Sequence, residues 1–345
     1  MEGVVPRPAV EEEEVVGLAR TLIDIESVTG NEGQVAHYVR DWLLKRGWVV
    51  ELQEVVAGRW NVYGRTAGGA GKNPRVVVNS HLDTVPPFFA SSVDATHVRG
   101  RGACDTKSLI AAQLLAVQQL VEEDSPGKDD IALLYVVGEE TDHVGITKAN
   151  ELGIDPRYLM VKGQKGYLGI TLRGEGIAAH SAYPERGKSA IEPLLDVLQD
   201  LRADVETWPH HPVLGKATMN IGTIQGGLVP NIVPESAAAR LSFRIVDPMQ
   251  QIIERVTQVV AGRVKIEVEP SMEAIELEVV EGYPTDVVGF GTDIPHFRFS
   301  GRAILWGAGS IRDAHGADEK IAIADLVQAV QSYKHIISTL ASRPS

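Results

Sequence analysis

The sequence predicts an α/β domain interrupted by a smaller, inserted α+β domain. Its 345 residues exceed what one hydrophobic core usually holds, so two domains are expected. Strand and helix patterns alternate in residues 1–165 and return in 280–345, which is typical of a parallel sheet covered by helices on both faces. Between residues 166 and 279 the order becomes strand, helix, strand, strand, helix, strand, which is typical of a two-layer α+β fold.

Hydrophobic periodicity predicts the elements of the first domain. Apolar residues spaced three and four apart indicate helices at 11–25, 32–46, 106–122 and 323–340. Predicted strands lie at 49–56, 61–65, 75–80, 131–137, 158–161 and 303–306. Because the segments at 75–80 and 131–137 are apolar runs, we expect these two strands to be buried.

The inserted domain is predicted to contain four strands and two helices. The strands are expected at 168–173, 218–226, 237–246 and 265–269, and the helices at 191–202 and 249–261. This βαββαβ order predicts a small two-layer α+β domain.

Composition and charge exclude several functional classes. The formal net charge of −13 repels phosphate backbones, so no nucleic-acid partner is expected. The single cysteine, Cys104, cannot form an intrachain disulfide, which fits a reducing compartment. The acidic first residues do not resemble a secretory signal, and no apolar run approaches the roughly 18 residues that span a bilayer. We therefore expect a cytoplasmic protein with no membrane segment.

The first polar cluster is Ser80-His81-Leu82-Asp83, directly after a predicted strand. Ligands of open α/β sheets gather at the carboxyl ends of strands. There His81 can offer an imidazole to zinc, and Asp83 can bind the other ring nitrogen and fix its tautomer. A turn with a solvated aspartate explains the cluster equally well when it is taken alone.

The second cluster, residues 100–107, holds two glycines and Asp105 just ahead of a predicted helix. Asp105 is a candidate metal ligand, although plain helix capping is the better explanation of this segment alone. Cys104 could also bind metal, but a buried thiol is the simpler expectation.

Two further clusters follow predicted strands. Glu139 and Glu140 come directly after an apolar strand, where adjacent carboxylates are costly to bury unless a positive group holds them. A metal supplies that charge, so that one glutamate can bind it while the other acts as a general base. His315, in the loop after the last strand, is a second candidate imidazole, although a lone loop histidine is usually solvated.

Together the clusters form an ordered series, His-x-Asp, Asp, Glu-Glu and a late His, that resembles the M20 metallopeptidase family over nearly the whole chain. That family includes acetylornithine deacetylases, succinyl-diaminopimelate desuccinylases, aminoacylases and carboxypeptidases. Residues 178–185, residues 227–234 and Arg244 resemble segments of its lid domain. Residues 291–295 and 314–319 are most similar to fungal-type acetylornithine deacetylase-like proteins. The resemblance implies a zinc-peptidase-like catalytic domain with a ferredoxin-like dimerisation and lid domain.

The resemblance also implies roles for individual residues. His81 would bind one metal ion, His315 and Glu140 the other, and Asp105 would bridge both. Glu139 would be the general base, and Asp83 would orient His81. The implied cofactor is Zn²⁺, one or two ions per chain, with Co²⁺ or Mn²⁺ as alternatives.

The inserted domain is implied to take part in substrate binding and assembly. In this family it mediates dimerisation, so we expect a homodimer formed through residues 166–279. His180 would stabilise the oxyanion across the dimer, and Asn231 and Arg244 would bind substrate. The planar guanidinium of Arg244 suits a substrate carboxylate.

One segment departs from the family pattern. The family has a further carboxylate ligand before the insert, whereas here the strand at 158–161 runs straight into Lys162 and the start of the insert. Neither Asp155, at the wrong end of that strand, nor Glu175, in the insert, is a comfortable replacement. Lys162 could become a ligand by carbamylation, but an ordinary solvated lysine is the simpler expectation. We therefore expect the metal site at His81 to lack one ligand.

These observations predict a metal-dependent hydrolase that cleaves an amide bond in a small N-acyl amino acid or a dipeptide. Two alternatives remain open from the sequence. One is an inactive or one-metal homologue that acts as a dimeric binding protein, and the other is a related enzyme that forms amide bonds.

Overall fold

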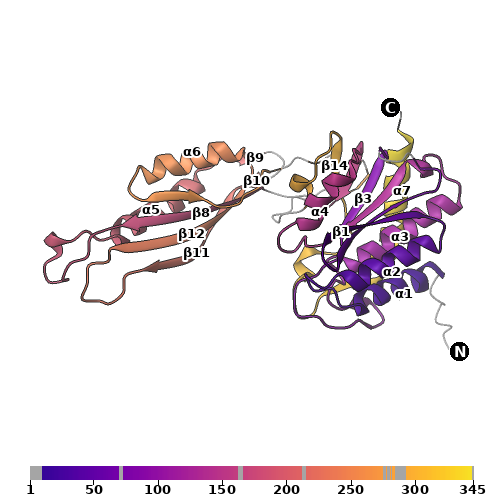
Figure 1. Ribbon diagram of the computed structural model, residues 1–345, viewed down its shortest axis with the longest axis horizontal. Coiled ribbons are helices and arrows are strands. Elements are labelled where there is room, and N and C mark those ends of the chain that lie inside the picture. Colours follow the sequence, from indigo (N-terminus) through magenta and orange to yellow (C-terminus); the bar gives the residue numbers. More distant parts are fainter. Residues whose placement is uncertain are drawn as a thin grey trace, which may run out of the picture. The chain divides into compact units, whose positions relative to one another are not determined.

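The protein is described here from a computed structural model (Figure 1). The structure describes residues 10–69, 73–161, 166–211, 215–274, 277, 280, 282–283 and 293–343. By the packing of the chain it divides into two compact units. Met1–Lys162, Leu277–Tyr283 and His296–Ser345 form the first unit, and Gly163–Glu276 and Pro284–Pro295 form the second. The predicted boundary at residue 165 lies outside the described residues.

A six-stranded sheet forms the centre of the first unit. Its strands, in spatial order, are β1 (Val49–Val56), β2 (Arg59–Arg65), β6 (Ile131–Val136), β3 (Val76–His81), β7 (Tyr158–Val161) and β14 (Arg302–Leu305). The last four strands are parallel to one another, as predicted. Strands β1 and β2 are antiparallel, contrary to the expectation of a parallel sheet. Only two residues join them, and a parallel pair needs a crossover of about a dozen residues.

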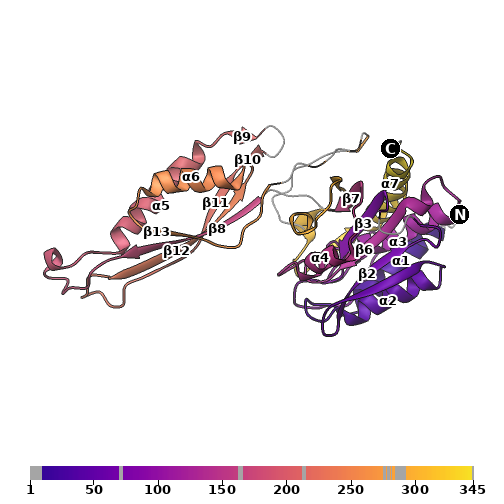
Figure 2. The same cartoon turned by 45° about the horizontal axis from the view of Figure 1, so that its top comes forward.

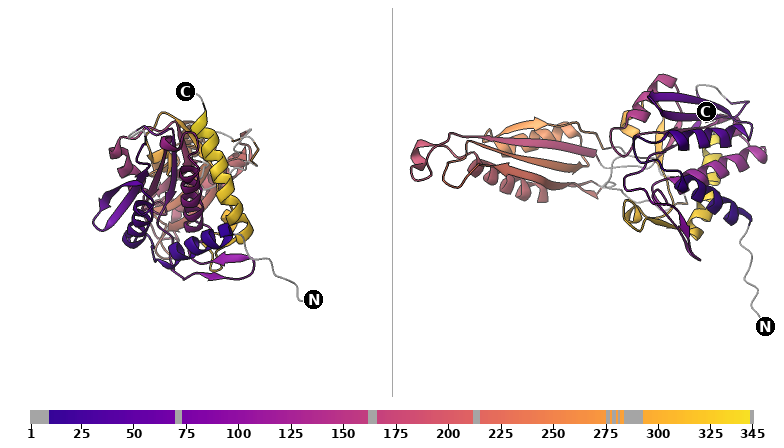
Figure 3. Two further views of the ribbon diagram at one scale, coloured as in Figure 1. Left: turned by 90° about the vertical axis from the view of Figure 1, so that its right-hand side faces the viewer. Right: turned by 60° about the horizontal axis from the view of Figure 1, so that its bottom comes forward.

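Five α-helices of the described residues belong to the first unit: α1 (Val10–Asp24), α2 (Gly33–Leu44), α3 (Lys107–Glu122), α4 (Val144–Ala149) and α7 (Ile323–Ser342). Helix α3 packs against α1 and α7, and the left view of Figure 3 shows the yellow C-terminal helix α7 on the same side of the unit as α3. Because neighbours surround it, α3 buries most of its circumference rather than the single stripe expected from its sequence. In the described part of the chain, no helix has both the length and the apolar character that crossing a membrane requires.

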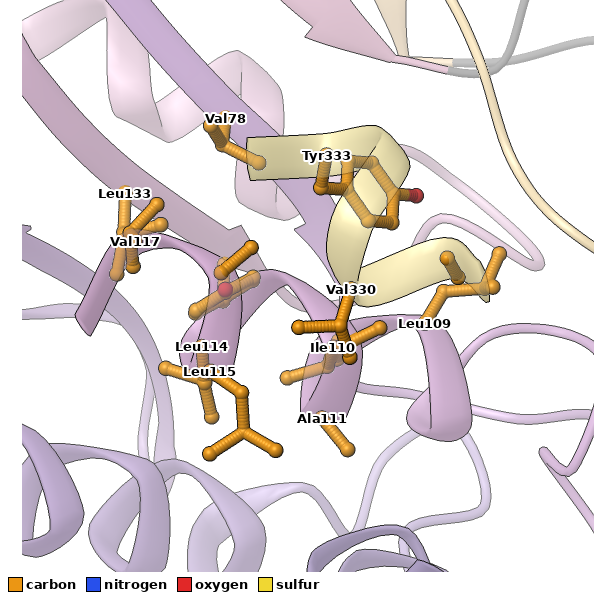
Figure 4. Packing of buried hydrophobic residues seen from close by; sticks show 14 of the residues in the cluster. Val78, Leu109, Ile110, Ala111, Leu114, Leu115, Val117, Leu133, Val330 and Tyr333 are labelled. Atoms are coloured by element: carbon orange, nitrogen blue, oxygen red, sulfur yellow. The ribbon is translucent and has the colours of Figure 1, made fainter. Parts of the chain in front are cut away.

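The core of the first unit lies between the sheet and the α3–α7 pair. Figure 4 shows Ile110 of α3 beside Val330 of α7, and Leu114 of α3, Tyr333 of α7 and Val78 of β3 belong to the same cluster. All five side chains are almost fully buried. This packing holds the carboxyl ends of the parallel strands in place, which matters because the candidate site lies there.

Short elements complete the first unit. A small sheet joins β15 (Lys320–Ala322), β5 (His97–Arg99) and β4 (Ser92–Val93). Single turns of 3₁₀ helix occur at Lys128–Asp130, Asn150–Leu152 and Ile311–Asp313, and a further turn, Ile294–His296, spans the point where the chain passes from the second unit back to the first. Strands of two or three residues are too short to show periodicity, which is why the sequence did not predict the small sheet.

The second unit has the predicted βαββαβ order. Its elements are β8 (Gly166–Glu175), α5 (Ile191–Glu206), β11 (Thr218–Gly226), β12 (Ser236–Ile245), α6 (Met249–Val260) and β13 (Lys265–Val268). The sheet is antiparallel in the order β11-β12-β8-β13, and α5 and α6 cover one face (Figure 2). This strand order is that of a ferredoxin-like fold, so the expected α+β architecture is confirmed. A two-stranded ribbon, β9 (His210–His211) with β10 (Gly215–Lys216), and a 3₁₀ turn at Pro184–Arg186 complete it.

Candidate metal centre

His81 is the last residue of β3, at the carboxyl end of a central parallel strand. The residue is 8% exposed. Nδ1 lies 3.0 Å from the backbone oxygen of Asp83, and Nε2 lies 3.1 Å from Oδ1 of Asp105. A proton on Nδ1, donated to that backbone oxygen, leaves the Nε2 lone pair directed at Asp105. This is the tautomer that a metal-binding imidazole needs.

Asp105 lies in the loop before α3, and its carboxylate connects two histidines. Oδ1 faces His81, and Oδ2 lies 3.6 Å from Nε2 of His315. The N-cap residue of α3 is Thr106, so the capping explanation of Asp105 is wrong. The adjacent Cys104 is buried, as expected, and its thiol donates to the backbone oxygen of Ser310 at 3.1 Å.

Glu139 and Glu140 lie in the turn after β6, and Asp83 holds that turn. The two oxygens of Asp83 accept the backbone N–H groups of Glu139 and Glu140 at 3.1 and 3.2 Å. Thr29 donates a further hydrogen bond of 2.8 Å to the same carboxylate. The Asp83 carboxylate lies 3.6 Å from Nδ1 of His81. It therefore contacts the imidazole and also fixes the backbone that carries both glutamates.

The side chains of the two glutamates face different histidines. Oε1 of Glu140 lies 3.1 Å from Nε2 of His315, and Oε2 of Glu139 lies 3.9 Å from Nε2 of His81. His315 follows the 3₁₀ turn after β14 and has a left-handed backbone, with φ of 64°. Its side chain is 49% exposed, but its ring nitrogen has a carboxylate partner, so the expectation of a merely solvated histidine does not hold.

The carboxylates around the two imidazoles favour the protonated, positively charged form of each ring. Burial of the His81 ring opposes its charged form, but the neighbouring carboxylates, above all Glu139, raise its pKa well above the usual value. The hydrogen bond to Glu140 raises the pKa of His315. Burial would raise the pKa of Asp83, but the contact with His81 and its hydrogen bonds lower it. A dication binding here would therefore displace protons.

The donor set fits a divalent metal. Ligand atoms of His81, Asp105 and Glu140 all lie within 4.8 Å of one another, and His315 joins them through Glu140 and Asp105. Two ligands that are each about 2.1 Å from a tetrahedral zinc ion are about 3.4 Å apart, close to the observed separations of 3.1 and 3.6 Å. Imidazole and carboxylate donors in this arrangement suit one or two divalent ions.

Replacing Asp83 with asparagine should weaken metal binding by about 10- to 100-fold, the usual effect of losing a group that supports the ligands. An amide nitrogen would have to face the N–H group of Glu139 or Glu140, so one hydrogen bond would become a contact between two donors. Titration of metal into the metal-free protein measures the change. Thr29→Val is the matched control, because it removes one bond to Asp83 and leaves both backbone bonds. An Asp83→Asn protein with wild-type affinity would contradict the supporting role.

No replacement for the expected further carboxylate is found among the described residues near β7. Asp155 accepts hydrogen bonds from the backbone and side chain of Ser300 at 2.6 and 2.8 Å, before the start of that strand. Glu175 belongs to the second unit and pairs with Lys265. Lys162 lies outside the described residues, as do Gly291 and Thr292 of the segment similar to acetylornithine deacetylase-like proteins.

The substrate-binding candidates of the second unit occupy two different places. His180 and Asn231 lie in adjacent segments, where His180 pairs with Ile232 and Ser181 N–H donates to the backbone oxygen of Asn231 at 3.0 Å. Nδ1 of His180 accepts the N–H of Ala182 at 3.1 Å, which leaves its Nε2–H available as a donor. Arg244 lies near the other end of β12, with its guanidinium over the ring of Tyr167.

Arg244 is eight positions along β12 from Ser236, which lies at the His180 end, and this corresponds to about 26 Å at the usual rise of a strand. A single copy of this unit therefore cannot bring His180 and Arg244 to one small ligand.

Sequence reasoning missed several residues that support the centre. Asn61 of β2 accepts the N–H of Val137 at 3.2 Å and donates to the backbone oxygen of Gly145 at 2.7 Å, so it holds both ends of the glutamate turn. Glu319 accepts three backbone N–H groups of the Asp105 loop. An isolated asparagine in a strand or glutamate in a loop gives no sequence signal, because only burial distinguishes it from a solvated residue.

Comparison with known families matches most of the chain in two parts. Residues 61–160 match the family described as peptidase family M28, and residues 162–267 match the peptidase dimerisation domain of M20 type. The second match covers the ferredoxin-like unit described above.

Relatives and solved structures extend the similarity over nearly the whole chain. A peptidase M20 domain-containing protein of Schizosaccharomyces pombe is 34% identical over 340 residues, covering 94% of this chain and 84% of the relative. A probable carboxypeptidase of Paracoccidioides brasiliensis is 33% identical over 389 residues, covering 97% and 87%. The crystal structure of a tripeptidase from Staphylococcus aureus has a TM-score of 0.77 at 22% identity, covering 96% of this chain and 99% of that one.

Proposed function

This chain belongs to the M20 peptidase family and is a carboxypeptidase-like hydrolase, and on that premise we propose that it cleaves the amide bond of a dipeptide or a small N-acyl amino acid. The observation that carries the proposal is the convergence of two histidines and two carboxylates, with Glu139 beside them. The acetylornithine deacetylase subtype stays a prediction, and the family's peptidase names favour a peptide substrate.

His81, Asp105, Glu140 and His315 would hold the metal. A divalent ion such as Zn²⁺, Co²⁺ or Mn²⁺ would polarise the scissile carbonyl and make a water molecule more acidic at neutral pH. Asp105 presents one oxygen to each histidine, which suits a bridging ligand when two ions bind. The hydrogen bonds that Asp83 accepts from their backbone N–H groups hold the ligand Glu140 and its neighbour Glu139 in fixed positions.

Glu139 is the proposed general base. Its carboxylate is near His81 but outside the group of converging ligand atoms, a position that suits a proton acceptor rather than a ligand. It would take that proton from the attacking water and deliver it to the leaving amine, which restores the carboxylate at the end of each turnover. The covalent change is the addition of water across one amide bond, which gives a carboxylic acid and an amine.

The second unit would supply oxyanion and substrate contacts, and we propose that it does so as a homodimer. The Nε2–H of His180 is available to donate to the developing oxyanion, and Asn231 lies beside it. Arg244 would pair with the substrate's carboxylate. Because about 26 Å of strand separates them, His180 and Arg244 at one substrate would come from different copies.

The alternatives left open by the sequence gain no support from the relatives. A non-catalytic binding protein and an amide-forming enzyme are both possible uses of such a site, but the relatives carry the names of peptidases and carboxypeptidases.

The test is a metal-reconstitution assay. The protein is stripped with a chelator, reloaded with Zn²⁺, Co²⁺ or Mn²⁺, and assayed against a panel of dipeptides and N-acyl amino acids. We expect turnover to depend on added metal and to fall when the substrate's carboxylate is amidated. Arg244→Lys is expected to raise KM for the free acids but not for the amides. A folded, metal-loaded protein that cleaves no member of the panel would refute the proposed function.

A further inference from the structure

We propose that Glu319 is a positioning residue that fixes Asp105 relative to His315 and thereby sets the metal affinity of the centre. The inference rests on the proposed metal centre but concerns a residue outside the proposed ligands. Glu319 is four residues after His315, and its side chain is completely buried.

The Glu319 carboxylate organises the backbone of the loop that carries Asp105. One oxygen, Oε1, accepts the N–H groups of Gly102, Cys104 and Asp105 at 3.1, 3.0 and 3.0 Å. Gly100 and Gly102 both have left-handed φ values, 143° and 89°, so the loop curls around the anion in a conformation that needs glycine. The N–H of Asp105 itself is one of the three donors, which fixes the backbone position of this ligand.

The other oxygen of Glu319 neutralises a buried arginine. Oε2 accepts from Nη1 of Arg101 at 2.7 Å, and Nε of Arg101 donates to the backbone oxygen of Pro87 at 3.1 Å. Arg101 is 2% exposed. Burying a carboxylate and a guanidinium is costly unless each retains good partners, and here the three N–H groups and the ion pair provide them.

The same glutamate ties this loop to the segment that carries His315. The backbone oxygen of Glu319 accepts the N–H of Gly100 at 3.1 Å, and the next residue, Lys320, pairs with Arg99 in the small sheet. The thiol of Cys104 adds a link to the backbone oxygen of Ser310. Asp105 and His315 thus stand on two segments joined through one carboxylate, and their side chains meet at 3.6 Å.

If the Glu319–Arg101 ion pair only stabilised the fold, loss of Glu319 would have a different effect on metal binding. In that case, loss of Glu319 would lower the thermal midpoint but leave the affinity of the remaining folded protein for metal unchanged. A positioning role predicts that folded protein binds metal more weakly, because Asp105 is no longer held where the ion needs it.

The experiment measures metal binding in the full-length chain rather than activity. Apo wild type, Glu319→Ala and Glu319→Gln are titrated with Zn²⁺ against a chromophoric chelator, and the Co²⁺-loaded forms are compared by visible absorption. Glu319→Ala should raise the Kd by about 10- to 100-fold and alter the Co²⁺ spectrum. Glu319→Gln should be affected less, because its amide oxygen can still accept the three N–H bonds.

Leu340→Ala is the matched control, since Leu340 is a fully buried residue of α7 that is not part of the proposed machinery. It should lower the thermal midpoint and keep the wild-type Kd.

Wild-type affinity and spectrum in folded Glu319→Ala, or an equal loss in Leu340→Ala, would overturn the inference. If Glu319→Ala does not fold, wild-type binding by Glu319→Gln would overturn it, and weakened binding would support it. A wild type that binds no divalent metal would refute the proposed function as well, whereas unaltered variants refute only this inference.

Discussion

Glu139→Gln is expected to lower kcat by at least about 100-fold, a typical contribution of a general base, while metal remains bound. Glutamine keeps the shape of the side chain but cannot accept a proton at neutral pH. The backbone of residue 139 would stay in place, because Asp83 binds its N–H rather than its side chain. The Glu139 carboxylate lies 3.9 Å from His81 and outside the converging ligand atoms, so its loss should cost the centre little metal affinity.

Two measurements on the same sample check this expectation. Metal content is determined by elemental analysis, and kcat is measured with the best substrate from the panel. Glu51→Gln is a suitable control, because Glu51 is an exposed carboxylate on β1 of the same unit. A Glu139→Gln protein that turns over at the wild-type rate would contradict the assigned role. Loss of metal together with activity would instead make Glu139 a ligand.

Local sequence pattern was sufficient for most of the fold. Helices such as α5 and α6 show their apolar stripes in the sequence, and their observed starts agree with the predicted ones. Strand direction was harder, because periodicity identifies a strand without saying how it pairs. The direction of β1 relative to β2 is decided by the two-residue connection between them, since so short a link permits only an antiparallel pair.

The candidate site was predictable in its location but not in its supporting contacts. His81 ends one central parallel strand and the glutamate pair lies in the turn after another, and the carboxyl ends of such strands meet at one edge of a sheet. The support given by Glu319 and Asn61 could not be predicted, because it depends on which backbone groups a distant turn presents. Whether a single polar residue supports the site becomes known only when the fold shows how deeply that residue is buried.

The two metal sites are expected to fill unequally, with the site at His315 occupied at lower metal concentration than the site at His81. Glu140 lies 3.1 Å and Asp105 3.6 Å from His315, so three residues of the kind that a catalytic zinc accepts meet there. His81 contacts the other oxygen of Asp105, and the described residues near β7 offer it no further carboxylate. With one negative ligand fewer, less of the positive charge of the metal ion is balanced at this site.

Separate removal of the two histidines tests this expectation by metal titration of the apo protein. His315→Ala should abolish the tightest site, with a loss well beyond the roughly 100-fold limit for a supporting group, because a direct ligand is gone. His81→Ala should remove only the weaker site, and His335→Ala, an exposed histidine of α7, should change neither. The close grouping of His81, Asp105 and Glu140 allows the opposite order, in which a single ion is held by His81. If His81→Ala abolished the tightest site while His315→Ala preserved it, the expected order would be wrong, and Glu140 would belong to the His81 site.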